Sequence, residues 1–135
     1  EVMGVCLDTS AYVRFREGEP SAVEAVVAAR DLAVPVIVLG ELRTGFRHGT
    51  QAATNERRLR EFLADPVVRV LDVDEDAADR YAALMTDLRR RGRPLPTNDV
   101  WIGALALREG LSILTADRHF EELRPAKVCL LPTAG

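Results

Sequence analysis

Short apolar runs alternate with amphipathic stretches along this chain, and the alternation predicts a repeating order of strands and helices. The apolar runs predict strands at 3–7, 34–39, 67–71, 112–114 and 127–131. The amphipathic stretches predict helices near 10–16, 20–31, 40–48, 54–64, 75–91 and 98–109, with one further turn at 118–123. Asp74 is the expected N-cap of the helix at 75–91, and Gly110 is expected to follow the helix at 98–109.

Strands separated by helices predict a particular fold class. Right-handed crossovers place the connecting helices on both faces of the sheet. We therefore expect a three-layer α/β/α sandwich with a central, mostly parallel five-stranded sheet, formed by one domain over residues 1–135. The paired helices at 40–64 and 75–109 are expected to form helical arms that project from the sheet.

Four acidic residues lie at places where such a fold binds ligands. Asp8, Glu41 and Asp117 follow the predicted strands 3–7, 34–39 and 112–114, and Asp99 opens the helix at 98–109. The carboxyl ends of parallel strands meet at one edge of the sheet, so these acids are expected to gather there. Two carboxylates 4 Å apart repel by about 4 kcal/mol at an effective dielectric of about 20. A bound cation relieves this repulsion.

Each acid also has a structural alternative. Glu41 at a helix start is a favourable charge for the helix dipole, and Asp117 suits a turn. Thr9 and Ser10 are candidate helix caps, which explains the hydroxyls but leaves Asp8 unexplained after a buried strand. Gly45 and Gly103 stand four residues after Glu41 and Asp99, so a small residue is expected beside each carboxylate.

The donor set indicates a hard divalent cation. Oxygen ligands suit Mg²⁺ or Mn²⁺, which retain waters and bind substrate phosphates. His48 and His119 have no ligand spacing for a softer metal. Such an ion lowers the pKa of a bound water and stabilises charge on a leaving oxygen, which is the chemistry of phosphodiester hydrolysis.

Composition limits the partners and the compartment. The net charge is −3, so nucleic-acid binding has to be local rather than spread over the molecule. No apolar run approaches the roughly 20 residues that span a bilayer, and the first residues do not resemble a secretory signal. Cys6 and Cys129 lie in apolar runs and suit buried free thiols. We expect a cytoplasmic protein without membrane contact.

A family resemblance rests on four segments that occur in a fixed order along the chain. They are Leu7-Asp8-Thr9-Ser10, Glu41-Leu42-Arg43-Thr44-Gly45, Arg91-Gly92-Arg93-Pro94 leading to Asn98-Asp99, and Leu114-Thr115-Ala116-Asp117-Arg118-His119-Phe120. With them the chain resembles the PIN-domain ribonucleases, most closely the VapC-type toxins of toxin–antitoxin pairs. The resemblance implies an endoribonuclease that uses Mg²⁺ or Mn²⁺ and cuts structured RNA such as tRNA or rRNA. It also implies a homodimer held inactive by a small cognate antitoxin.

The same resemblance assigns roles to residues. The metal ligands fall on Asp8 and Asp99 first, then on Asp117 and Glu41, all four forming the catalytic site. The resemblance also implies residues that support these ligands without ligating the metal: Thr9, Ser10, Asn98 and Thr115. Arginine is the better bidentate partner for phosphate, and the candidates for the RNA backbone are Arg14, Arg43, Arg93 and Arg118.

Three other interpretations compete with this one. A haloacid-dehalogenase-like phosphatase needs a second aspartate where Ser10 stands and a lysine before Asp117. A response-regulator receiver needs an acidic pair at the first strand. The remaining alternative is a non-catalytic PIN-like binding module, in which the acids hold a partner or a structural ion.

Overall fold

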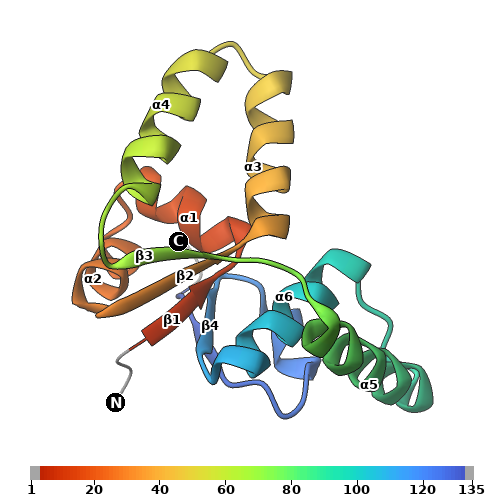
Figure 1. The fold of residues 1–135 in the computed structure, drawn as a ribbon. Helices are drawn as coiled ribbons and strands as arrows, with labels where there is room; N and C mark the ends of the chain where they lie inside the picture. Colours follow the sequence, from red (N-terminus) through yellow and green to blue (C-terminus); the bar gives the residue numbers. More distant parts are fainter. Residues whose placement is uncertain (1–3, 133–135) are drawn as a thin grey trace.

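A five-stranded sheet, parallel throughout, forms the centre of the protein (Figure 1). The computed structural model describes residues 4–132. The strands are β1 (Gly4–Leu7), β2 (Asp31–Pro35), β3 (Val68–Leu71), β4 (Ser112–Thr115) and β5 (Val128–Leu130), in the spatial order β3-β2-β1-β4-β5. The expected fold class is confirmed.

Six α-helices and one 3₁₀ helix connect the strands. They are α1 (Thr9–Arg16), α2 (Pro20–Ala28), α3 (Val36–His48), α4 (Ala52–Leu63), α5 (Glu75–Arg91), α6 (Thr97–Glu109) and η1 (Arg118–Glu122). Asp74 caps α5 by accepting a hydrogen bond from the Ala77 backbone N–H, and Gly110 follows α6 with φ of 68°. Both terminal signals read from the sequence are therefore confirmed.

The strand order creates a crevice at the carboxyl edge of the sheet. From β1 the chain moves outward to β2 and β3, then returns to place β4 on the other side of β1. Figure 1 shows α1, α3 and α4 above the sheet, and α5 and α6 below it. The connections after β1 and β4 thus leave in opposite directions. Open parallel sheets bind ligands at such a point, outside the carboxyl ends of the two strands.

The predicted strand at 34–39 is wrong, and so is the end of the preceding helix. Helix α2 stops at Ala28, β2 already begins at Asp31, and α3 begins at Val36. Proline lacks an N–H for the sheet ladder and suits the residue before a helix, so Pro35 ends the strand. The next residues are β-branched, but Val38 and Leu39 bury one helical face, and packing outweighs their strand preference.

Helix α1 supports both helices of the arm formed by α3 and α4, which projects from the sheet (Figure 1). The ring of Tyr12 meets Phe62 of α4 edge to face at 5.2 Å between centroids, and Phe15 lies 5.5 Å from the same ring. Arg16 donates to the Tyr12 hydroxyl and to the backbone carbonyl of Arg58. These contacts fix the base of α4 against α1.

Gly103 does not leave space beside Asp99, contrary to the sequence expectation. A Cβ at this position would lie 2.8 Å from Leu123 Cδ1 and 3.5 Å from Leu84 Cδ1. The glycine instead lets α6 approach α5 and the segment after η1. At Gly45 an added Cβ would meet nothing within 4 Å, as expected.

No helix within residues 4–132 combines the length and apolar character needed to cross a bilayer. Cys6 and Cys129 are both free, and Cys6 is buried. Burial raises the pKa of the Cys6 thiol well above its usual range, so this thiol packs as an apolar group.

We expect Gly103→Ala to be less stable than the matched variant Gly45→Ala. Each gains roughly 0.5–1 kcal/mol from helix propensity, but Gly103→Ala adds an overpacking cost of about 1–3 kcal/mol against Leu123. Urea unfolding of the two variants and the parent measures the difference. Equal stabilisation by both substitutions would contradict the close approach at Gly103.

Candidate active site

Asp8 lies at the centre of the crevice, directly after β1. Its side chain is 5% exposed and accepts three kinds of hydrogen bond. The Ala11 backbone N–H donates to Oδ1 at 2.9 Å, Ser10 Oγ donates at 2.8 Å, and Thr115 Oγ1 donates to Oδ2 at 2.6 Å. Burial raises the pKa of the Asp8 carboxyl, and these donors partly offset that effect. The helix cap is thus Asp8 itself, not Thr9 or Ser10.

Glu41 reaches the site from the second turn of α3, not from a strand end. Thr9 Oγ1 donates to its Oε1 at 2.5 Å, and Asn98 Nδ2 donates to its Oε2 at 3.2 Å. The sequence expectation that Glu41 opens a helix is therefore wrong, and its charge does not act on a helix N-terminus. Its carboxylate joins the starts of α1 and α6.

Asp99 occupies the first turn of α6, as expected, and its carboxyl is affected by the charges of all three other acids. Burial first, and then the charges of Asp117, Glu41 and Asp8, raise the pKa of Asp99 to about 6, while His119 acts in the opposite direction. The helix N-terminus would by itself favour an ionised carboxylate. Desolvation and like charge outweigh it.

Asp117 follows β4 and caps η1. Its Oδ1 accepts from the His119 backbone N–H at 2.9 Å and lies 3.0 Å from the His119 ring Nδ1. Its own backbone N–H donates to Thr115 Oγ1 at 2.9 Å. Because Thr115 also donates to Asp8, one buried hydroxyl connects the two acids that flank the crevice.

The structure thus brings the four predicted acids to the carboxyl edge of the sheet. Asp8 and Asp117 come from adjacent strands, and Asp99 and Glu41 come from helices on opposite faces of the sheet. Within residues 4–132, no three Asp, Glu, His or Cys side chains already converge as a complete metal cluster. Mutual repulsion of the carboxylates opposes such convergence when no cation screens it.

The basic residues named from the sequence differ in their surroundings. Arg14 pairs with Glu19 at 3.0 Å, Arg43 pairs with Glu56 at 2.9 Å, and Arg118 lies 3.6 Å from Glu121. The side chain of Arg93 has no hydrogen bond or ion pair with the described part of the chain. Glu56 was not singled out from the sequence. Its i,i+4 spacing to Arg60 was the only local signal.

Comparisons with known proteins agree with this fold. The family model described as "PIN domain" matches residues 5–124. Ribonuclease VapC5 of Mycobacterium tuberculosis is 33% identical over 117 residues, which cover 87% of this chain and 85% of that protein. Ribonuclease VapC4 of the same organism is 32% identical over 101 residues, covering 75% and 78% of the two chains.

Solved structures give the same result for the fold. In the structure of VapBC-5 from M. tuberculosis, the matching chain is 31% identical with a TM-score of 0.72, covering 97% of this chain and 99% of that one. VapBC2 from Rickettsia felis bound to a promoter DNA fragment has a TM-score of 0.87 at 21% identity, covering 96% and 100%. The chain belongs to the PIN-domain family. Within that family it is of the VapC type.

Without a metal, we expect the contribution of Asp99 to stability to fall as pH rises from about 4 to about 6. The folded-state pKa of Asp99 is raised to about 6, so the native state binds the proton more tightly and loses that advantage as the carboxyl ionises. Asp99→Asn should flatten this slope and melt a few degrees higher than the parent at pH 7 in EDTA, since 1 kcal/mol corresponds to about 3–6 °C at this size.

Asp79→Asn is the matched control, because Asp79 is exposed on α5 and its side chain makes no hydrogen bond with the described residues. It should melt like the parent across the pH range. Thermal melts from pH 4 to 8 in EDTA measure the effect. If the melting temperature of Asp99→Asn changed with pH as that of the parent does, Asp99 would not be one of the mutually repelling carboxylates.

Proposed function

We propose that this protein is a metal-dependent endoribonuclease toxin of the VapC type, neutralised by a cognate antitoxin. The observation that carries the proposal is the set of four acids at the switch point of a PIN fold, with Asp99 under the charge of the other three. Relatives named ribonucleases at about one-third identity over most of the chain support the reaction type.

The proposed ion is Mg²⁺ or Mn²⁺, held by Asp8 and Asp99 with Asp117 and Glu41. The site fits such an ion because its donors are carboxylate oxygens whose mutual repulsion a cation would relieve. When bound, the ion supplies a water of lowered pKa and stabilises charge on the leaving oxygen of a phosphodiester.

The chain's own residues prepare this site before the ion binds. Ser10, Thr115 and the Ala11 N–H hold both Asp8 oxygens in place, so the carboxylate needs little reorganisation. Thr9 and Asn98 hold the two oxygens of Glu41. Asp117 is oriented by the backbone N–H of His119. These contacts direct several carboxylates toward one crevice in which a phosphodiester can lie.

The proposed substrate is a structured RNA such as tRNA or rRNA, and the proposed partner is a small VapB-like antitoxin. One structural neighbour is described as a toxin–antitoxin complex from Klebsiella pneumoniae, and VapBC-5 from M. tuberculosis is described as a member of the VapBC family of toxin–antitoxin systems. We also propose a homodimer that acts in the cytoplasm. Two free cysteines suit that reducing compartment.

RNA cleavage is expected to require the divalent ion and two of its ligands. EDTA should abolish cleavage, and Asp8→Asn or Asp99→Asn should lower the rate by about two orders of magnitude or more, whereas Asp79→Asn should not. Mn²⁺ should raise the melting temperature of the parent more than that of either variant, because ligand binding stabilises the fold by RT ln(1 + [L]/Kd). Equal cleavage by antitoxin-free protein in EDTA would refute the metal mechanism.

Expression of the protein alone should arrest growth of the host, and co-expression of the cognate antitoxin should restore it. Asp99→Asn expressed alone should be harmless, since it keeps the shape of the side chain and removes a proposed metal ligand. Colony counts after induction measure the effect. A folded, metal-binding parent that leaves growth unchanged would favour the non-catalytic binding module instead.

A further inference from the structure

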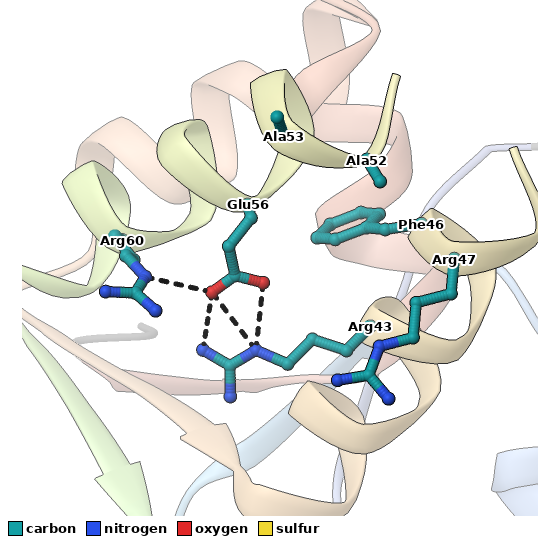
Figure 2. Close-up of a pocket in the computed structure, with 7 residues that line it drawn as sticks. All are labelled: Arg43, Phe46, Arg47, Ala52, Ala53, Glu56 and Arg60. Carbon is teal, nitrogen blue, oxygen red and sulfur yellow. Dashed lines mark hydrogen bonds and ion pairs between the residues drawn. The ribbon is translucent and has the colours of Figure 1, made fainter. Parts of the chain in front are cut away.

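A cleft of about 540 Å³ opens between the two helices of the arm (Figure 2), and none of the four acids lines it. Arg43, Phe46 and Arg47 line it from α3, and Glu56 and Arg60 line it from α4. The ring of Phe46, together with Ala52 and Ala53, forms its apolar part. The cleft therefore combines guanidinium donors with an apolar surface.

This arm is basic although the protein as a whole is acidic. Residues 36–63 carry five arginines and three glutamates, while the whole chain has a net charge of −3. Three of those arginines line the cleft beside the single carboxylate of Glu56. Positive charge concentrated on one projecting element attracts a polyanion locally, whatever the net charge.

Glu56 holds two of the guanidinium groups in fixed positions. It accepts from Arg43 Nε at 3.1 Å and Arg43 Nη2 at 2.9 Å, and from Arg60 Nε at 3.1 Å. Arg43 Nη1 and both terminal nitrogens of Arg60 make no hydrogen bond with residues 4–132. A guanidinium that is already oriented loses less conformational entropy when it binds an anion.

Arg47 is a third donor of the cleft. It stands one turn after Arg43 on the same face of α3, and no described residue accepts a hydrogen bond from its side chain. In Figure 2 the side chains of Arg43 and Arg47 extend toward the same side of the cleft. The two groups together present several unpaired N–H donors to one incoming anion.

We propose that this cleft is a phosphate-binding subsite for the RNA strand whose scissile bond lies at the acids. The inference rests on the proposed nuclease function. Helix α3 carries both Glu41 and Arg47, six residues or about 9 Å apart along its axis, so a short stretch of RNA at the acids can extend to the cleft. The Phe46 ring offers a surface for a ribose or base, which distinguishes RNA from an acidic peptide.

The test compares Arg47→Gln with Arg30→Gln, each made in the Asp99→Asn background so that RNA stays intact. Arg30 is exposed and directly precedes β2, so it lies at the amino ends of the strands, away from the acids. Its side chain makes no hydrogen bond with the described residues. Fluorescence anisotropy in EDTA measures binding of a labelled oligouridylate of about 12 nucleotides, within the usual site size, over a range of salt concentrations.

Arg47→Gln should weaken binding by roughly fivefold to tenfold and reduce the slope of log K against log salt by about 0.7, the value for one phosphate contact on a single strand. Arg30→Gln should leave both unchanged. With Asp99 intact, Arg47→Gln should raise the KM of cleavage rather than lower kcat. Equal effects of Arg47→Gln and Arg30→Gln on affinity and slope would overturn the subsite.

Polyglutamate of matched length separates the two kinds of anion. If it bound as tightly as the oligouridylate with the same dependence on Arg47, the cleft would be an acidic-peptide site and the proposal would be wrong. Cleavage by the parent in Mn²⁺ is measured separately. Cleavage without Arg47-dependent binding refutes only the subsite, and Arg47-dependent binding without cleavage refutes only the nuclease.

Discussion

Asp8, at the end of the central strand, is only 5% exposed to solvent. Burying an ionised carboxylate costs several kcal/mol unless hydrogen bonds from the protein replace those it made with water. The donors come from two segments that are distant in sequence. Ala11 and Ser10 belong to the first turn of α1, and Thr115 ends β4. The start of α1 therefore has to lie against the end of β4. This requirement locates the crevice between the ends of β1 and β4.

Helix α1 connects this buried acid with the projecting arm. Its first residue, Thr9, binds Glu41 of α3, and one turn later Tyr12 packs against Phe62 of α4. The eight residues of α1 thus contact Asp8, α3 and α4, so one short helix positions both the arm and the buried acid.

The sequence predicted helix ends correctly where a capping residue marks them. Helix α5 begins as the Asp74 cap indicates, and α6 ends as Gly110 indicates, because capping depends on a few neighbouring residues. The run Val34 to Leu39 misled the prediction because β-branched residues suit a buried strand and a buried helical face alike. Gly103 was interpreted as space for a ligand, but its contact with Leu123 depends on how α6 packs.

The sequence alone determined the order of strands and helices, the parallel sheet, and the presence of acids after β1 and β4, since hydrophobic periodicity and strand-end chemistry are local properties. Only the tertiary structure decided how the acids are held. Thr115 reaches Asp8 across 107 positions and Thr9 reaches Glu41 across 32. A hydrogen bond between such distant positions depends on how whole elements pack, and no local pattern encodes that packing.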